Sequence, residues 1–280
     1  MLKFIKTLIY NSFRIVVRIF KYFRLSFPYN RRHNIIIRKI FDFSIKSIPF
    51  FNTFFSDLKN LKFYSQFIRE SDLCFDIGAN VGEKTRIYLK LGAKVICVEP
   101  QKDCIENLLK LYGRNKNVII VDKAVGEKEE YGELFICDEG NRLSTISKKF
   151  RTKVRFPNVS GGYHWKKKVN VSITTLNSLI KTYGLPKFCK IDVEGYEFEV
   201  LKGLTKRIPF ICFEFHMDLF DDLKKCINHL LSFGPAKFNF VIRQIPEFYL
   251  SSWVSPNILY KKLISIGSES LIGDIYVKYI

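Results

Sequence analysis

The sequence predicts a doubly wound α/β domain with a mainly parallel sheet of about seven strands. Short apolar runs bounded by turn residues alternate with longer segments in which apolar residues recur at helical spacing. At residues 73–98, one apolar run is followed by Gly78 and Gly82, then by a helical segment and a second run that ends in Glu99. This layout is one β-α-β unit, with glycines in its first turn and a carboxylate at the tip of its second strand.

The same periodicity predicts the remaining elements in order. The apolar runs expected as strands are 73–77, 94–98, 118–121, 134–137, 169–174, the run from 188, 210–215, 238–242 and 274–279. The expected helices are 57–69, 83–91, 102–112, 176–183, 197–206 and 218–233. Because strands and helices mostly alternate, we expect one mainly parallel sheet with an antiparallel strand at its edge.

The charge divides the chain into two parts. Residues 1–60 hold 12 Lys and Arg against 2 Asp and Glu, a net charge of +10. Residues 61–280 hold 34 against 25, a net charge of +9 over a much longer stretch. At 280 residues there is room for one ordinary α/β domain plus an extension. We therefore predict a basic, amphipathic, helical extension over 1–55 and the α/β domain over 56–280.

The extension has two open interpretations. Along residues 1–23, single cations fall on one side of a helix and aliphatic and aromatic residues on the other. Such a helix can lie in a membrane interface, as a peripheral contact, or it can pack on the domain or on a second subunit. No uncharged run approaches the ~20 residues of a transmembrane helix. Arg14 and Arg18 also interrupt the apolar region that a secretory signal needs.

The cysteines indicate a reducing compartment. There are seven, an odd number, and none forms a C-x-x-C pair. Cys74, Cys97, Cys189 and Cys212 fall inside expected buried strands, where a thiol serves as a small core residue. Neither a disulfide framework nor a zinc site is indicated. The expected location is therefore the cytoplasm, with peripheral contact to a membrane as an option.

The first loop indicates which nucleoside the domain binds. It reads Asp76-x-Gly78-x-Asn80-x-Gly82, whereas a dinucleotide fingerprint would read G-x-G-x-x-G, with a helix N-terminus aimed at a pyrophosphate. An acidic residue at the head of the loop would repel a pyrophosphate but can hold an ammonium group. S-adenosyl-L-methionine carries an ammonium and no phosphate, so the loop favours it as cofactor. Glu99 can then accept both ribose hydroxyls.

Residues at the ends of the next strands complete the expected cofactor site. Pro100 follows the acidic strand tip, and Asp122 and Lys123 follow the third strand, where an adenine would lie. Asp122 is either an acceptor for the adenine amino group or an ordinary turn residue. The polar stretch 141–147 is expected to cover the cofactor. The irregular stretch 148–168, rich in cations and aromatic residues, is either an acceptor-recognition loop or a mobile surface insertion.

Four candidate catalytic residues stand at the ends of the sixth and seventh expected strands: Asp192, Glu194, Glu214 and His216. An alcohol acceptor must lose its proton, because a neutral hydroxyl is a poor nucleophile. Asp192 is the first choice for a base or base-orienting residue, and His216 is the second. The clustered carboxylates can instead hold a divalent cation that lowers the pKa of the hydroxyl, and the sequence does not choose between these roles.

Six blocks of residues occur in order along the chain: Asp76-Ile-Gly-Ala-Asn-Val-Gly82, Val98-Glu-Pro100, Ala124-Val-Gly126, Thr175-Leu-Asn-Ser-Leu179, Lys190-Ile-Asp-Val-Glu-Gly-Tyr-Glu197 with Val200-Leu-Lys-Gly203, and Phe213-Glu-Phe-His216. Over roughly residues 71–280 the chain thereby resembles the FkbM-type S-adenosylmethionine-dependent methyltransferases. The resemblance implies a Rossmann-like class I methyltransferase fold and methyl transfer, usually to an oxygen, often on a sugar or polyketide. Asn177 replaces the Asp of the family's Thr-Leu-Asp-Ser block, and the extension lies outside the resemblance.

Three classes of function follow. The leading hypothesis is O-methylation of a hydroxyl on a sugar, glycan or other small-molecule acceptor. A nucleic-acid methyltransferase is suggested by the net charge of +19. However, the strand tip lacks the Asn/Asp-Pro-Pro-aromatic signature of base amino-methylation, and its acidic residues would repel a phosphate backbone. The third class is a non-enzymatic, membrane-associated protein with a retained fold, against which Asp76, Gly78, Gly82 and Glu99 argue.

Overall fold

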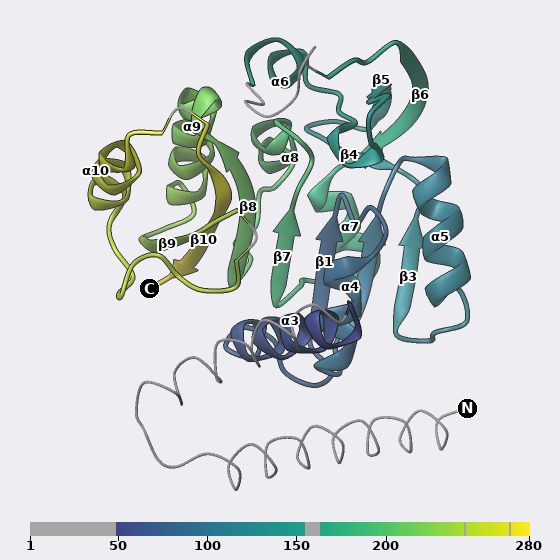
Figure 1. The fold of residues 1–280 in the computed structure, drawn as a ribbon, viewed down its shortest axis with the longest axis horizontal. Helices are drawn as coiled ribbons and strands as arrows, with labels where there is room; N and C mark the ends of the chain where they lie inside the picture. The colour runs from purple at the N-terminus through teal and green to yellow at the C-terminus, as the bar shows by residue number, and fades with distance from the viewer. Residues whose placement is uncertain (1–48, 155–162, 244, 269) are drawn as a thin grey trace, which may run out of the picture. The chain divides into compact units, whose positions relative to one another are not determined.

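The computed structural model describes residues 49–154, 163–243, 245–268 and 270–280 (Figure 1). The chain divides into two compact units, Met1–Ser56 and Asp57–Ile280, and the description below concerns the second. Residues 1–48 lie outside the described part, so the amphipathic helical extension expected over 1–55 stays a prediction. Within the described residues, no helix has both the length and the apolar character needed to cross a membrane.

Seven strands form the main sheet: β1 (Leu73–Ile77), β2 (Lys94–Val98), β3 (Val118–Val121), β7 (Phe188–Ile191), β8 (Phe210–His216), β9 (Ala236–Ile242) and β10 (Ile272–Tyr279). Their order across the sheet is β3-β2-β1-β7-β8-β10-β9, and the first five run parallel. The chain builds outward from β1 to β3 and then returns to the other side of β1 with β7. This reversal is the topological switch point of a doubly wound fold, so the predicted fold class is confirmed.

The predicted antiparallel edge is confirmed, because the last pairings at one side of the sheet are antiparallel, and the strand that runs against the others lies one position inside the edge. β10 pairs antiparallel with β8 on one side and with β9 on the other, which makes β9 the edge strand. The inner position buries side chains on both faces of β10, such as Ile275 on one face and Tyr276 on the other. It also buries Asp274 between β8 and β9.

Two expected strands belong to a separate sheet, which corrects the prediction of a single sheet. β5 (Glu130–Ile136) pairs antiparallel with β6 (Lys167–Thr174), and β4 (Ala124–Val125) pairs with the other side of β6. Much of β5 and β6 is exposed, and their buried side chains form a small core of their own. Strands with exposed positions along one face cannot lie in a sheet that helices cover on both sides.

The helices are α3 (Pro49–Tyr64), α4 (Glu83–Lys90), α5 (Lys102–Tyr112), α6 (Lys148–Lys153), α7 (Leu176–Tyr183), α8 (Glu197–Lys202), α9 (Phe220–Leu231) and α10 (Pro256–Ile266), with 3-10 turns at Asn141–Leu143 and Met217–Leu219. α3 begins at Pro49, well before the predicted start at 57, because proline is tolerated in the first turn of a helix. α10 was not predicted, although Ser255 and Pro256 mark its start and Gly267, with φ 70°, its end.

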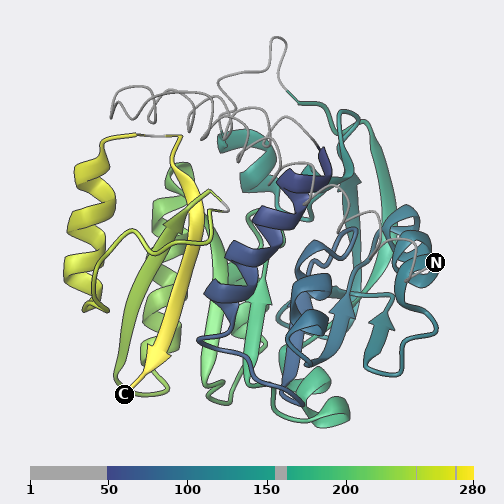
Figure 2. The ribbon, with the colours of Figure 1, turned by 60° about the horizontal axis from the view of Figure 1, so that its bottom comes forward.

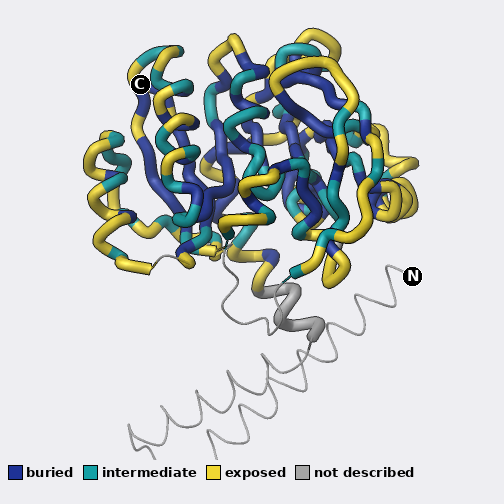
Figure 3. The backbone as a smooth tube through the Cα atoms, turned by 90° about the horizontal axis from the view of Figure 1, so that it is seen from above, coloured by how far each residue is buried: buried dark blue, intermediate teal, exposed yellow. Residues whose placement is uncertain are grey.

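Helices cover both faces of the main sheet (Figure 2). Side chains of α7, α8, α9 and α10 pack on one face, and side chains of α3, α4 and α5 pack on the other. Figure 3 shows the buried strands enclosed by elements with exposed outer surfaces. All seven cysteines are buried and free, which confirms that those in the strands serve as core residues.

Candidate active site at the switch point

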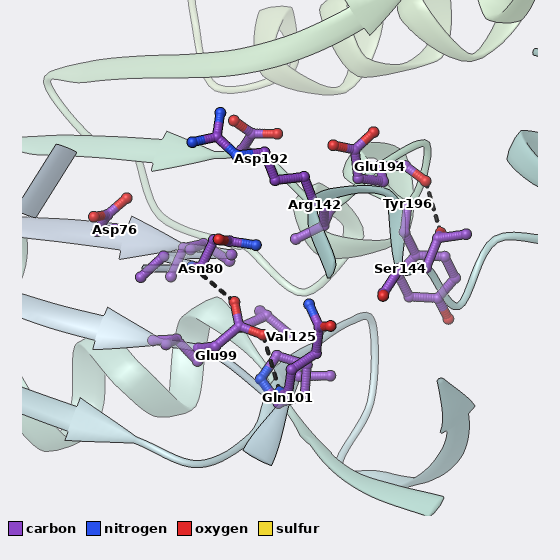
Figure 4. Close-up of a pocket in the computed structure, with 18 of the residues that line it drawn as sticks. Asp76, Asn80, Glu99, Gln101, Val125, Arg142, Ser144, Asp192, Glu194 and Tyr196 are labelled. Atoms are coloured by element: carbon purple, nitrogen blue, oxygen red, sulfur yellow. Dashed lines mark hydrogen bonds between the residues drawn. The ribbon is translucent and has the colours of Figure 1, made fainter. Parts of the chain in front are cut away.

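A cavity opens at the carboxyl ends of β1, β2 and β7 (Figure 4). Its empty space, including the part open to solvent, is about 970 Å³. The walls are the β1–α4 loop, the turn after β2, residues 123–125, residues 142–146 and the β7–α8 loop. The cavity therefore lies at the switch point of the sheet, where doubly wound folds bind their ligands.

The β1–α4 loop approaches the end of β7 closely because Gly78 has no side chain. Its φ is +75°, and a Cβ atom there would lie 1.9 Å from the backbone oxygen of Asp192. Asn80 also has a left-handed backbone, with φ 48°, a conformation that asparagine tolerates better than most residues. Both residues line the cavity.

Glu99 is buried at the tip of β2 and faces the cavity. Its two carboxylate oxygens accept the backbone N–H groups of Asn80, at 2.8 Å, and of Gln101, at 2.9 Å (Figure 4). Burial raises the pKa of Glu99 to about 7, and these hydrogen bonds oppose the rise. The carboxylate is thus held in one orientation by the backbone on either side of it.

Asp76 is buried at the other end of the loop and also lines the cavity. Its Oδ2 accepts a hydrogen bond of 2.6 Å from the hydroxyl of Thr85 on α4. Burial raises the pKa of Asp76, and the Thr85 hydrogen bond and the Lys190 charge lower it. In the β1–β7 register, Asp76 and Lys190 are directly opposite each other. Adjacent parallel strands therefore place a buried cation beside this carboxylate.

Lys190 is fully buried, and the sequence pattern around it predicts no role for it. Its Nζ lies 3.0 Å from Asp192 Oδ2 and 2.9 Å from Asp274 Oδ1, so it links β7 to β10. Burial disfavours the lysine charge, but the two aspartates outweigh this effect and raise the pKa of Lys190. A lysine inside the apolar strand Phe188–Ile191 and an aspartate inside Ile272–Tyr279 were the signals available in the sequence.

The structure separates the four candidate catalytic residues into two pairs. Asp192 and Glu194 line the cavity from the β7–α8 loop, whereas Glu214 and His216 are buried in β8 and are not part of its lining. His216 Nε2 lies 3.3 Å from Glu214 Oε2 and 3.9 Å from Glu194 Oε2. All four therefore meet at one end of the sheet, but only the first pair faces a ligand directly.

The protonation of these groups follows from their burial. Burial raises the pKa of Asp192, but the Lys190 charge outweighs this effect and the net shift is downward. Burial and neighbouring carboxylates raise the pKa of both Glu194 and Glu214 well above the usual range. Burial lowers the pKa of His216, so its imidazole is neutral at pH 7. Asp192 is consequently the ionised carboxylate of the group.

Some of the predicted cofactor-binding residues line the cavity and others do not. Pro100 and Lys123 line the cavity, whereas Asp122 is exposed and Gly82 is buried outside the lining. A Cβ atom on Gly82 would lie 2.7 Å from the ring of Tyr112, so this glycine allows α5 to pack closely on the loop. Asp122 has no contact with the cavity that would support a role at an adenine.

The polar stretch 141–147, predicted as a whole to cover the cofactor, supplies individual residues to the cavity wall. Arg142 lines the cavity and forms an exposed ion pair, at 2.5 Å, with Glu83, which also lines it. The hydroxyl of Thr145 donates to the backbone oxygen of Glu194, at 2.7 Å. The indole of Trp165, from the expected acceptor-recognition loop, donates to the backbone oxygen of Leu143. Residues 155–162 of that loop lie outside the described part.

Residues 76–242 match the family described as the methyltransferase FkbM domain. The chain belongs to this family. A search of curated proteins gives no match. The predicted membership of an S-adenosylmethionine-dependent methyltransferase family is therefore confirmed.

Similar solved structures include a precorrin-6Y C5,15-methyltransferase from Geobacter metallireducens GS-15, with a TM-score of 0.41, 12% identity, and coverage of 80% of this chain and 87% of that chain. A putative rRNA methylase from Clostridium thermocellum has a TM-score of 0.39 and 11% identity, covering 80% of this chain and 96% of the other. Fibrillarin from Aeropyrum pernix, in complex with natively bound S-adenosyl-L-methionine, has a TM-score of 0.35 and 10% identity, covering 75% and 68%.

Proposed function

We propose that this protein is an S-adenosylmethionine-dependent O-methyltransferase whose acceptor is a hydroxyl on a sugar, glycan or other small molecule. The observation that carries the proposal is one shared cavity with two acidic walls. Glu99 lies at the tip of β2 on one wall, and Asp192 and Glu194 follow β7 on the other. A cofactor site and a proton-accepting site therefore border the same space.

The residues of the first wall suit S-adenosylmethionine. Each oxygen of Glu99 accepts one backbone N–H, and the remaining lone pairs of the carboxylate can accept from a ribose hydroxyl. Asp76 is placed for the ammonium group of the cofactor, and Lys84, which also lines the cavity, for its carboxylate. When bound, the cofactor supplies a methyl group activated by the sulfonium charge. The protein then has to align the acceptor and remove its proton.

Asp192 is the proposed base on the second wall. It lines the cavity, and the Lys190 charge keeps it ionised, so it can accept the proton of an acceptor hydroxyl. The ion pair with Lys190, at 3.0 Å, also fixes the direction of the carboxylate. His216 stays the second choice for the base, since it is buried in β8 and does not line the cavity.

Two steps test the proposal. Calorimetry of the full-length protein with S-adenosylhomocysteine is expected to show binding. Labelled methyl donor is then offered with nucleotide sugars, glycans, RNA and DNA in parallel, and label is expected in a saccharide acceptor. Label in RNA or DNA would instead support a nucleic-acid methyltransferase. Absence of S-adenosylhomocysteine binding would support a non-enzymatic protein with a retained fold.

We also propose that the protein is cytoplasmic and contacts a membrane peripherally through residues 1–55. The support is the net charge of +10 in residues 1–60, together with the separation of cations from apolar residues along 1–23. Such a contact would bring the enzyme close to lipid-linked saccharides as acceptors. Sedimentation of the full-length and truncated chains with anionic vesicles tests this contact.

A further inference from the structure

Glu194, Glu214 and His216 bring two carboxylate oxygens and one imidazole nitrogen together. One ligand atom from each residue lies within 4.8 Å of the other two. Glu214 and His216 are two positions apart in β8, so both side chains leave the same face of that strand. Glu194 comes from the loop after β7, the strand parallel to β8 and next to it. The cluster therefore depends on the pairing of these two strands.

One oxygen of this cluster lacks a partner. Glu194 Oε2 is buried and forms no hydrogen bond, and His216 Nε2 lies 3.9 Å from it. No lysine or arginine of the described residues forms an ion pair with Glu194 or Glu214, since the nearby Lys190 is paired with Asp192 and Asp274. A buried carboxylate oxygen without a partner is costly, and a bound cation would satisfy it.

The geometry points to a divalent metal site formed by Glu194, Glu214 and His216. The charge of a divalent cation balances two carboxylates and a neutral imidazole. The separations of 3.3 Å and 3.9 Å from His216 Nε2 to the two oxygens suit donors that share one ion at about 2.0–2.2 Å from each. The cluster is nearly closed on the β8 side, and Glu194 connects it to the cavity.

The donor set selects the class of ion. An imidazole nitrogen with two carboxylates suits a first-row transition ion such as Mn²⁺ or Zn²⁺, whereas Mg²⁺ and Ca²⁺ prefer oxygen ligands alone. The catalytic role of the ion rests on the proposed function. At this wall of the cavity, it would lower the pKa of an acceptor hydroxyl beside Asp192. The metal site would then belong to the acceptor half of the cavity, away from Glu99.

A metal titration of the full-length protein tests the site. After treatment with a chelator, Mn²⁺ and Zn²⁺ are added in separate experiments. Electron paramagnetic resonance reports free Mn²⁺, and elemental analysis reports bound Zn²⁺. We expect close to one equivalent of either ion per chain, and weaker binding of Mg²⁺. Failure of the wild-type protein to bind Mn²⁺ or Zn²⁺ at millimolar concentration would overturn the site.

Two matched variants locate the ion. Glu194→Gln removes one ligand charge, and because Glu194 Oε2 makes no hydrogen bond we expect the variant to fold. Its affinity for Mn²⁺ is expected to fall at least about tenfold. Glu197→Gln removes another buried carboxylate nearby, but its amide oxygen can still accept the N–H groups of Val193 and Gly195. This control is expected to bind Mn²⁺ like the wild type, and equal affinities in both variants would contradict the assignment.

Calorimetry with S-adenosylhomocysteine separates this inference from the proposed function. Metal-free wild-type protein that binds S-adenosylhomocysteine but neither ion would overturn the metal site and leave the cofactor site standing. Protein that binds a metal but not S-adenosylhomocysteine would do the reverse. Thermal unfolding of each variant shows whether a lost affinity reflects the site or the fold.

Discussion

At the scale of single residues, the carboxylate of Glu99 can be tested by replacing one oxygen. Glu99→Gln leaves a single oxygen as acceptor for a ribose hydroxyl. Its amide N–H₂ also has to face the backbone N–H of Asn80 or Gln101, so that a donor meets a donor. We expect the affinity for S-adenosylhomocysteine to fall at least about tenfold, or 1.4 kcal/mol, measured by calorimetry. Glu106→Gln, an exposed position on α5, serves as the control. Unchanged affinity in a folded Glu99→Gln protein would remove the basis of the enzymatic proposal.

The pH dependence of binding provides a second test of the same residue. Burial raises the pKa of Glu99 to about 7, and the ionised form is the better acceptor for ribose hydroxyls. Lowering the pH through 7 protonates the carboxylate, so affinity is lost on the acid side and retained on the alkaline side. We expect calorimetric affinity to decline below about pH 7, approaching tenfold per pH unit, and the decline to vanish in Glu99→Gln. A flat wild-type profile across this range would contradict the assignment.

Replacing Gly78 tests whether the fold needs the close approach between the β1–α4 loop and the end of β7. Gly78→Ala combines a positive φ with a Cβ atom 1.9 Å from the backbone of Asp192. We expect the free energy of unfolding to fall by roughly 2–4 kcal/mol, measured by urea denaturation. Gly267→Ala has a similar φ of +70° but meets no atom within 4 Å, so it isolates the backbone strain. That control is expected to cost about 1 kcal/mol, and an equal cost for both would rule out the steric account.

At the scale of elements, Lys190 and Asp274 join β7 to β10 across β8. Their side chains are 1% and 3% exposed, so neither can exchange its partner for water. Lys190→Met leaves the buried Asp274 and the half-buried Asp192 without their cation and is expected to lower the free energy of unfolding by about 3–5 kcal/mol. Asp274→Asn is expected to cost less, because Lys190 keeps Asp192. Urea denaturation of both single variants and the double variant measures the coupling, and simple additivity would show that the pair is not coupled.

At the scale of the whole molecule, the uneven charge predicts a membrane contact that the catalytic domain alone does not make. We expect the full-length protein to sediment with vesicles containing anionic lipid, and a chain lacking residues 1–48 to remain in solution. Truncation before Pro49 keeps α3 whole. High salt and neutral vesicles are expected to weaken the binding, because the attraction is electrostatic. Equal sedimentation of the two chains would contradict the proposal.

Prediction from sequence succeeded where the signal is local. The bounds of β1, β2, α5 and α7 were predicted correctly, because apolar spacing and flanking turn residues define them within a few positions. In the site, Asn80, Glu99 and Pro100 line the cavity as expected. Asp122 does not, since proximity to a strand end does not say which way a side chain points, and Gly82 lies against Tyr112 of α5 instead. α10 was missed although both of its ends carry ordinary helix signals.

By itself, the sequence determined the β-α-β unit, the loop that begins at Asp76 and the carboxylates that follow the strands, because each depends on neighbouring residues. Only the tertiary structure decided that β10 lies inside the sheet and that Glu214 and His216 lie behind the cavity wall. It also decided that Lys190 pairs with Asp274, a residue 84 positions away. The physical reason is that strand order and register bring such groups together, and the periodicity of a single segment carries no information about its neighbours in the sheet.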